Sequence, residues 1–525
     1  MANPPPPYDN ITGISRAAMK DNAQESLANY NGNARPGELV VDQTTTILYI
    51  GNALGELTAV ATPGGATTWA LLSNKNNASG PASIALGTNA GTSQGNTAIA
   101  IGYGTAYSGQ SANAIALGFA AGYGNQQANA IAIGTAAGYT TQGISSVAIG
   151  ARAGLTSQGN QSVAIGENAG VIQGSTAVAI GQNAGGATAL QGDDAVAVGH
   201  GAGENTQGTQ SVAIGLYSGQ VAQGIQSVAV GKQAGQTTQG AYSVAVGDSA
   251  GTTTQGIQSV AVGQRAGFSN QGQYSVAIGA YAGNSAQGER TVAVGYGAGI
   301  TSQGNSAIAI GNYAGNATQG TYAIAIGSNA GDQGQGANTV AIGFGAGNAQ
   351  GLQSIAIGLQ AGQTAQGPNN IAIGQQAGST NQIGSSVAIG FQAGYVDQDI
   401  QSVAIGIQAG YSTQGLNAVA IGAASGNVQG ANAVAIGRQA GANGQGDAAV
   451  AIGRQAGQTS QANNSIILNA TGSALNQTTA NTFTVKPVRA VTSVTFAAPT
   501  AGSIPAGFSP VYYNPTTGEL IVITP

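Results

Sequence analysis

A four-residue phrase recurs along most of this chain: a small hydrophobic residue, alanine, an aliphatic residue and glycine. Residues 147–150 and 163–166 are two copies, and the closing glycine usually returns after 16 residues, with a few steps of 15 and one of 18. A chain that repeats one short unit forms an extended array in which each unit packs on its neighbours. The period therefore constrains the fold more than any single residue does.

Within each unit, Ser-Val-Ala-Ile-Gly alternates with period two, which is typical of a short strand. Val147 and Ile149 share one face of that strand, and Ala148 lies on the other. A helix is excluded because 88 of the 525 residues are glycine, each costing about 1 kcal/mol relative to alanine in a helix. The sequence predicts an all-β parallel β-solenoid, or β-roll, of about 24 coils, each with two short strands.

The repeat also predicts which residues form the core and the corners of a coil. We expect the larger aliphatic side chains in the structural core, namely Val147, Ile149, Val163, Ile165, Val212 and Ile214. Glycines at fixed offsets mark corners where φ must be positive or chains approach closely. These corner residues are Gly150, Gly154, Gly159, Gly166, Gly170 and Gly174.

One coil cannot be stable alone. Ordering its residues costs on the order of 1–2 kcal/mol each, whereas two buried aliphatic side chains contribute only about 1.5–3 kcal/mol each. The alanine side chains on the face that carries Ala148 are too small to shield a sheet from water. We expect another chain to approach this face, which makes the protein a homo-oligomer. The alternative is that alanine simply fits a narrow coil interior.

The unit Ser-Val-Ala-Ile-Gly-x-x-Ala resembles the repeat of YadA-type heads of trimeric adhesins, over roughly residues 83–469. This resemblance implies a left-handed parallel β-roll assembled as a homotrimeric rod. Residues 35–42 and 47–51 are similar to segments near the N-terminus of phage tail fibres. Residues 464–472 and 512–519 look like segments that close such repeats in phage and large-virus fibres.

The chain divides into three expected regions. Residues 1–80 form an N-terminal attachment region with a proline-rich start, a short helix beginning near Ser15, and a β-hairpin. Residues 81–469 form the repeat rod, and residues 470–525 form a C-terminal cap or tip with a second hairpin. Hairpins at both ends would cover sheet edges that otherwise template aggregation.

Composition excludes several classes of function. Charged residues are 6% of the chain and the net charge is −5, so the basic footprint of a nucleic-acid-binding protein is missing. There is no cysteine, and His200 is the single histidine, so one copy cannot form a thiolate site, a catalytic triad or a multi-histidine metal site. No apolar stretch approaches the ~20 residues of a membrane helix. We expect no enzyme activity, no cofactor and no membrane insertion.

Few residues are candidates for chemistry or binding. Asp397 and Asp399 are weak candidates for a calcium site, as is the pair Asp193 and Asp194, with ordinary solvated loop charges as the alternative. Tyr512 and Tyr513, near the C-terminus, are weak candidates for receptor binding.

Glutamine recurs at one corner of the repeat. The matching positions are Gln142, Gln158, Gln207, Gln223, Gln239, Gln255 and Gln271. In a stacked solenoid their amides should lie one above another and form a hydrogen-bonded ladder. The ladder has two interpretations: reinforcement of the fold, or a polar stripe that recognises glycans. Tyrosines also favour corners, where packing on the surface or stacking on sugars is possible.

These observations favour a homotrimeric fibre or spike on a virion surface, most simply that of a phage. Its N-terminal region would bind a virion protein, and its tip would contact a host receptor or glycan. A virion decoration protein that binds no receptor and a bacterial trimeric surface adhesin are the alternatives. We do not expect a bacterial adhesin, because the chain lacks the secretion signal, stalk and membrane anchor of that family. An ice-binding solenoid would need a flat threonine array, which the repeat does not provide.

Overall fold

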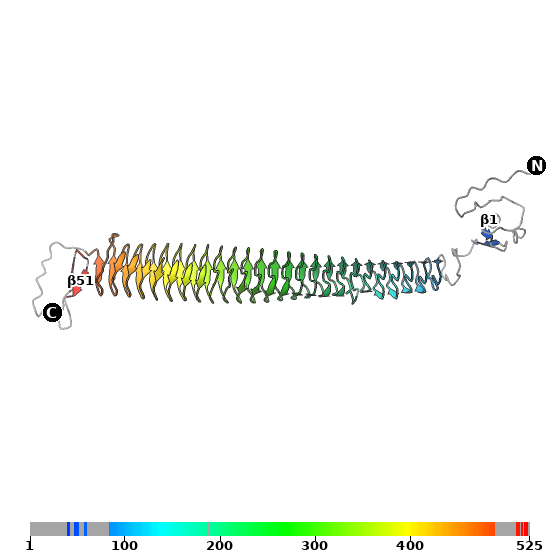
Figure 1. Ribbon diagram of the computed structural model, residues 1–525, viewed down its shortest axis with the longest axis horizontal. Coiled ribbons are helices and arrows are strands. Elements are labelled where there is room, and N and C mark those ends of the chain that lie inside the picture. Colours follow the sequence, from blue (N-terminus) through cyan, green and yellow to red (C-terminus); the bar gives the residue numbers. More distant parts are fainter. Residues whose placement is uncertain are drawn as a thin grey trace, which may run out of the picture. The chain divides into compact units, whose positions relative to one another are not determined.

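The computed structural model describes residues 39–42, 47–51, 57–59, 83–186, 188–488, 511–514, 516–517 and 519–522. The chain separates into two compact units, Met1–Ser211 and Val212–Pro525. Both are built from short parallel strands on successive coils (Figure 1). Over these described ranges the chain is all-β, with no helical segment. The predicted parallel β-solenoid is confirmed, with about 25 turns and a period of roughly 16 residues.

Each coil contributes one strand from the Val-Ala-Ile phrase, here called the long strand, and most coils contribute a second strand of two or three residues that ends in glutamine, here called the short strand. At Gln94, Gln191, Gln335 and Gln350 an isolated bridge takes the place of the short strand. The long strands of the first unit are β4 (Ile84–Leu86), β5 (Ile99–Ile101), β7 (Ile115–Leu117), β9 (Ile131–Ile133), β11 (Val147–Ile149), β13 (Val163–Ile165), β15 (Val178–Ile180) and β16 (Val196–Val198). Its short strands are β6 (Ser108–Gln110), β8 (Gly124–Gln126), β10 (Thr141–Gln142), β12 (Ser157–Gln158), β14 (Ile172–Gln173) and β17 (Asn205–Gln207).

The second unit repeats the same arrangement. Its long strands are β18 (Val212–Ile214), β20 (Val228–Val230), β22 (Val244–Val246), β24 (Val260–Val262), β26 (Val276–Ile278), β28 (Val292–Val294), β30 (Ile308–Ile310), β32 (Ile324–Ile326), β33 (Val340–Ile342), β34 (Ile355–Ile357), β36 (Ile371–Ile373), β38 (Val387–Ile389), β40 (Val403–Ile405), β42 (Val419–Ile421), β44 (Val434–Ile436), β46 (Val450–Ile452) and β48 (Ile466–Asn469). Its short strands are β19 (Val221–Gln223), β21 (Thr238–Gln239), β23 (Thr254–Gln255), β25 (Ser269–Gln271), β27 (Ser285–Gln287), β29 (Ser302–Gln303), β31 (Thr318–Gln319), β35 (Thr364–Gln366), β37 (Thr380–Gln382), β39 (Val396–Gln398), β41 (Thr413–Gln414), β43 (Val428–Gln429), β45 (Asn443–Gln445) and β47 (Thr459–Gln461).

Successive coils stack in register, so equivalent residues lie opposite each other. In the pairing of β11 with β13, Val147 lies opposite Val163. The turns continue this pairing, since the Gly150 amide donates to the Ile133 carbonyl at 2.8 Å. Stacking therefore satisfies backbone groups in the strands and the corners alike, which an isolated coil could not do.

The predicted orientation of the long strand is inverted. Ala148 is fully buried, as is Ala153 at the following corner, whereas Val147 and Ile149 are half-buried. Val163, Ile165 and Val212 are likewise half-buried, and Ile214 is 40% exposed. None of these aliphatic side chains lines the interior of its own coil. The interior is filled mainly by alanine, serine and the glutamine of the short strand. Alanine therefore fits a narrow coil, and the expectation that the alanine face meets another chain is wrong.

The corner glycines have the two roles expected from the sequence. Gly150 and Gly154 have positive φ, at 128° and 56°, as do Gly166 and Gly170. Gly159 is required by close approach instead, because an added Cβ would overlap the backbone of Gly174 in the next coil, and Gly174 meets the next coil in the same way.

Some corners hold left-handed residues that are not glycine. In the same coil as Gly150, Arg152 and Gln161 have φ of 59° and 56°. Such a conformation costs roughly 1–2 kcal/mol for an L-residue. The backbone hydrogen bonds between neighbouring coils hold these residues in place, since the Arg152 amide donates to the Thr135 carbonyl at 2.8 Å.

Both terminal regions contain antiparallel strands. In the first unit, β1 (Leu39–Asp42) pairs with β2 (Ile47–Gly51), where the sequence predicts a hairpin, and β3 (Leu57–Ala59) adds a third strand. In the second, β49 (Phe483–Lys486) pairs with β48 as one more parallel strand. It then pairs antiparallel with β51 (Glu519–Val522), which forms a hairpin with β50 (Val511–Tyr513). The expected helix near Ser15 lies outside the described residues.

Candidate interaction surfaces

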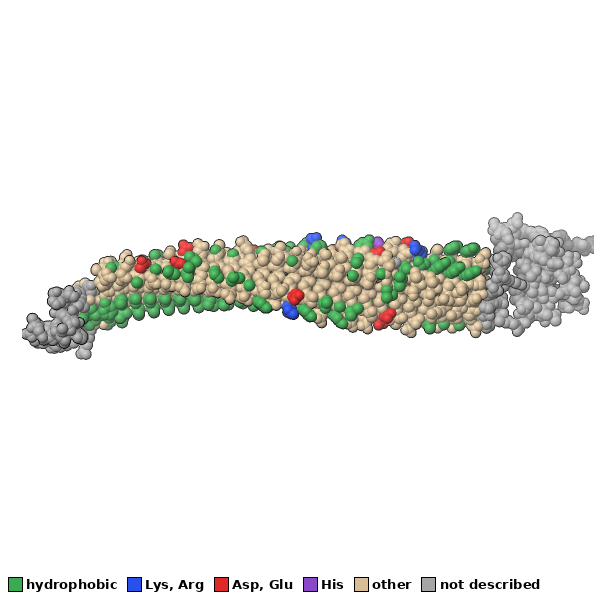
Figure 2. Space-filling view, turned by 90° about the horizontal axis from the view of Figure 1, so that it is seen from below, with side chains coloured by type: hydrophobic (Ala, Val, Ile, Leu, Met, Phe, Trp, Pro, Cys, Tyr) green, Lys and Arg blue, Asp and Glu red, His purple; other side chains and the backbone are tan. Residues whose placement is uncertain are grey.

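The outward side chains of the long strands form an aliphatic face on each unit. We define the aliphatic face as the first and third residues of the Val-Ala-Ile phrase in successive coils. Most of these side chains are half-buried, and several are more than a third exposed, including Ile180 at 37%, Ile278 at 40% and Ile310 at 38%. Rows of hydrophobic side chains are visible on the second unit towards its C-terminal end (Figure 2). Such contiguous apolar surface is typical of a protein interface.

The interior glutamines form the predicted ladder. Gln126 Nε2 donates to Gln142 Oε1 at 3.0 Å in the first unit. In the second unit each amide donates to the next without interruption along Gln287, Gln303, Gln319, Gln335, Gln350, Gln366, Gln382, Gln398, Gln414, Gln429 and Gln445. Some steps lack this bond, and the Oε1 atoms of Gln255 and Gln271 have no partner. The ladder is therefore present, with gaps.

Burial decides between the two interpretations of the ladder. Gln142 and Gln255 are 0% and 2% exposed. Their Nε2 atoms also donate to backbone carbonyls of the long strand, as Gln142 does to Ile131 at 2.7 Å. A buried amide cannot contact a glycan, so the glycan interpretation of this ladder is wrong and the reinforcing one is supported.

Surface aromatic residues form short rows along the coils. Tyr107, Tyr123 and Tyr139 stack in parallel, with centroid distances of 5.1 and 4.8 Å. Tyr103 stacks on Phe119 at 5.5 Å, and Tyr395 on Tyr411 at 5.1 Å. In these rows each ring covers one face of its neighbour, while Tyr103 and Phe119 remain 56% and 57% exposed.

A different arrangement is found in the second unit. Tyr296 meets Tyr281 edge-on, at 6.0 Å and 72°, and Tyr313 at 5.3 Å and 86°. A hydrogen bond to Tyr296 raises the pKa of Tyr313 above its ordinary value, with some desolvation. Arg265 lies over the rings of Phe268 and Tyr281, at 5.0 and 5.9 Å from their centroids.

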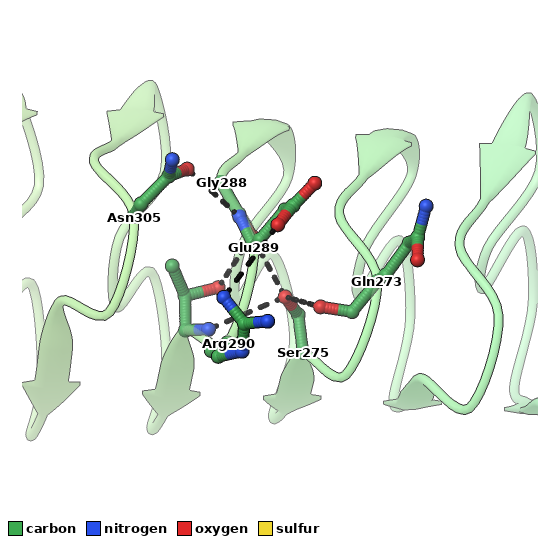
Figure 3. Close-up of polar contacts among 7 residues, drawn as sticks. Gln273, Ser275, Gly288, Glu289, Arg290 and Asn305 are labelled. Carbon is green, nitrogen blue, oxygen red and sulfur yellow. Dashed lines mark hydrogen bonds and ion pairs between the residues drawn. The ribbon is translucent and has the colours of Figure 1, made fainter.

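A second arginine lies at the opposite corner of the coil. Arg290 lies 5.7 Å from the ring centroid of Tyr274 and pairs with Glu289 at 3.7 Å. Figure 3 shows this corner, where the Glu289 amide donates to Asn305 Oδ1 in the next coil at 3.0 Å. Ser275 Oγ donates to the Gly288 carbonyl at 2.7 Å. The polar contacts here connect neighbouring coils.

The carboxylates predicted as weak metal candidates mostly accept hydrogen bonds from the protein. Asn381 Nδ2 donates to Asp397 Oδ1 at 3.0 Å, and the Ile400 amide donates to Asp399 Oδ1 at 2.7 Å. Both carboxylates line a surface hollow with Gln414. Within the described ranges, no three histidine, cysteine or acidic side chains come together as a metal site. The calcium interpretation of Asp397 and Asp399 therefore gains no support.

The other candidates are dispersed. Asp193 accepts from the Ser175 amide at 2.8 Å and Asp194 from the Thr176 hydroxyl, both in the preceding coil. His200 is exposed at the turn after β16. Tyr512 and Tyr513 belong to β50, and their side chains lie outside the described structure. Among the predicted site residues whose side chains the structure describes, Asp397 and Asp399 share a surface hollow.

Comparison with known families identifies the repeat. The model of the YadA head domain repeat matches residues 78–105, 191–218, 222–250, 239–266, 271–298 and 429–456. The chain carries YadA head domain repeats. No curated protein and no solved structure matches the chain.

YadA head domain repeats imply a trimeric, adhesin-like fibre exposed on a surface. The fold is an adhesin-type structural fold and not that of an enzyme family. Across the described segments, no helix is long and apolar enough to cross a membrane.

Sequence reasoning missed the cluster around Arg265. Arg265 and Tyr281 occupy the same position, two residues after the strand glycine, in consecutive coils. An alignment of the coils on their glycines would have placed them side by side. The sequence shows tyrosines in this column, at Tyr217, Tyr281 and Tyr313, and Arg265 occupies the same column.

Proposed function

We propose that the protein is a homotrimeric fibre or spike on a virion surface that mediates attachment to a host. Residues 1–80 would hold it to the particle, and residues 470–525 would form its distal end. The observation that carries this proposal is the aliphatic face, because half-exposed valine and isoleucine rows on coil after coil need a covering partner. Two further copies of the same chain supply a face of the same length and period.

The trimer has a direct test. Ile278 lies on the aliphatic face and is 40% exposed, while Ile257 is 43% exposed at a different corner, after Gln255 and Gly256. Ile278→Lys should lower the sedimenting mass of the protein from three chains towards one, because a buried charge in the interface costs several kcal/mol. Ile257→Lys should stay trimeric. A wild-type protein that sediments as a single chain would refute the trimer.

Attachment is tested on particles. Immunogold electron microscopy should label the protein on the virion exterior, and particles that lack it should lose binding to host cells. Replacing both Tyr512 and Tyr513 with alanine should weaken that binding if the C-terminal end touches the receptor. If this double variant binds host cells fully, the fibre proposal stands, but these tyrosines do not contact the receptor.

A bacterial trimeric surface adhesin is the second candidate, since YadA head domain repeats fit it equally well. The two candidates differ in where the protein resides. Labelling of a bacterial cell surface, with gene neighbours for secretion instead of capsid proteins, would select the adhesin. Labelling of purified particles would select the virion fibre.

A further inference from the structure

We infer that the surface around Arg265 binds an anionic glycan, a proposal that rests on the attachment function and assigns it a ligand class and a site. We define the arginine–tyrosine patch as Arg265, Phe268, Tyr281, Tyr296 and Tyr313. These residues come from four consecutive coils, at the corner that follows β24, β26, β28 and β30. The patch lies at a corner and not on the aliphatic face, so a trimer formed through that face does not require its burial.

The guanidinium of Arg265 is held in place yet open to an anion. It contacts the rings of Phe268 and Tyr281 at 5.0 and 5.9 Å, which orients its plane. Arg290 is paired with Glu289 at 3.7 Å, whereas the interactions of Arg265 are those with the two rings. The nearby Asp248 accepts from the hydroxyl of Ser249 and forms no ion pair with Arg265. An exposed arginine without a carboxylate partner suits bidentate binding of a carboxylate or sulfate.

The tyrosines beside it leave ring surface uncovered. An edge-to-face contact places the edge of one ring against the face of the other, in contrast to the parallel stack of Tyr107 and Tyr123, whose planes differ by 13°. Tyr296 contacts both neighbours edge-to-face and is 47% exposed. Such a ring can pack against the apolar face of a sugar.

The phenol groups add hydrogen-bonding capacity, and the position of one ring is built into the backbone. Tyr296 and Tyr313 lie 5.3 Å apart between ring centroids, and their phenol oxygens can both donate and accept hydrogen bonds, as sugar hydroxyls require. Gly297 lies under Tyr313, where an added Cβ would come within 2.8 Å of the ring. Because Gly297 has no side chain, the Tyr313 ring can pack against the coil at this position.

The combination favours one ligand class over others. A neutral sugar would use the rings and leave the Arg265 charge unused, and an acidic peptide would use the charge and have less use for flat ring faces. A sugar that carries a carboxylate or sulfate uses both. Because the net charge of the chain is −5, long-range attraction does not favour anions, and recognition has to be local.

The test measures binding of defined oligosaccharides to the full-length protein by isothermal titration calorimetry. The probes are a hyaluronate oligosaccharide for the carboxylate, a heparin oligosaccharide for the sulfate, and a maltooligosaccharide as the neutral control. We expect binding of one or both anionic probes and none of the neutral one. Arg265→Gln should weaken it about tenfold or more, the loss of one charge-assisted contact. Tyr296→Ala should weaken it, and Tyr296→Phe should weaken it less.

The matched control is Arg152→Gln. Arg152 also lies two residues after a strand glycine, but its ring-bearing neighbours are replaced by Leu155 and Asn168. The Arg152→Gln variant should bind the oligosaccharides as tightly as the wild type does. Equal affinity of Arg265→Gln and wild type, or binding of a poly-glutamate peptide in place of the glycans, would overturn the patch. Circular dichroism checks that each variant is folded.

Host-cell adhesion separates the two proposals. If Arg265→Gln loses no oligosaccharide binding while wild-type particles still adhere, the patch assignment fails and the attachment function stands. If the oligosaccharides bind through Arg265 but the protein is absent from any particle or cell surface, the attachment function fails and the site stands.

Discussion

Glutamine occupies the space that alanine leaves inside each coil. Gln303 Nε2 donates to the carbonyls of Val292 and Ala307 at 2.9 and 3.3 Å, and to Gln319 Oε1 at 3.1 Å. Its own Oε1 accepts from Gln287 at 3.1 Å. A single side chain therefore satisfies groups in three coils, and the long polar residue acts as the centre of an otherwise small-residue core.

Gln303→Leu is expected to destabilise the protein. Leucine fills part of the volume but leaves the Val292 carbonyl and Gln319 Oε1 without this donor, at about 1–3 kcal/mol for each buried unpaired group. The guanidinium midpoint of unfolding should fall. Gln273→Leu is the control, because that side chain is exposed at a corner, and its midpoint should change little. Equal midpoints for the two variants would contradict a structural role of the ladder.

Two glycines allow the cost of a backbone clash to be measured separately from the cost of a positive φ. At Gly159 an added Cβ would overlap the backbone of Gly174, whereas at Gly104, with φ of 62°, it would meet nothing within 4 Å. Gly104→Ala should cost only the roughly 1–2 kcal/mol of a left-handed alanine. Gly159→Ala should cost more, because neighbouring coils must separate. Denaturant unfolding of both variants checks the order, and a larger loss for Gly104→Ala would contradict it.

At the scale of the strand, the sequence predicted which residues share a face but not which face is inside. Period two places Val147 and Ile149 together and Ala148 opposite. We assigned the larger side chains to the interior, as is usual for a core, yet Ala148 is the buried residue. The interior is too narrow for valine because glutamine from the short strand already fills it.

The candidate sites show a similar limit. Repeat position predicted the glutamine ladder, because stacking places equivalent residues in contact whatever the shape of the coil. Repeat position could not predict the edge-to-face orientation of Tyr281, Tyr296 and Tyr313, since ring orientation depends on side-chain packing between coils. The last long strand, β48, ends in Asn469 in place of the closing glycine.

The parallel tyrosine row is expected to stabilise the stacking of coils. Tyr123 stacks on Tyr107 and Tyr139 with planes 13° apart in both pairs. Tyr123→Ala removes two ring contacts, each about 0.5–1.5 kcal/mol, and should lower the unfolding midpoint and reduce the near-UV circular dichroism signal. Tyr123→Phe keeps the rings and should stay close to the wild type. A phenylalanine variant as unstable as the alanine one would assign the effect to the hydroxyl instead.

For the molecule as a whole, stability is a sum over coils and the contacts between neighbours. Each coil repeats the same pairings, as Val228 with Val244 and Val244 with Val260. In these pairings each strand contacts only the strands of the neighbouring coils. Removing a whole repeat should therefore be tolerated where removing part of one is not.

Deletion of residues 240–255 tests this. The deletion joins Gln239 to Gly256, restores the Gln-Gly corner, and brings Val228 opposite Val260 in the register that Val244 occupies now. Circular dichroism per residue and the number of chains by sedimentation should be unchanged, with only a small decrease in the unfolding midpoint. Deleting residues 240–247 removes β22 but leaves half a coil, which shifts the phase of the repeat and should unfold the neighbouring coils. If both deletions were equally disruptive, stability would depend on long-range cooperativity and not on the stacking of interchangeable units.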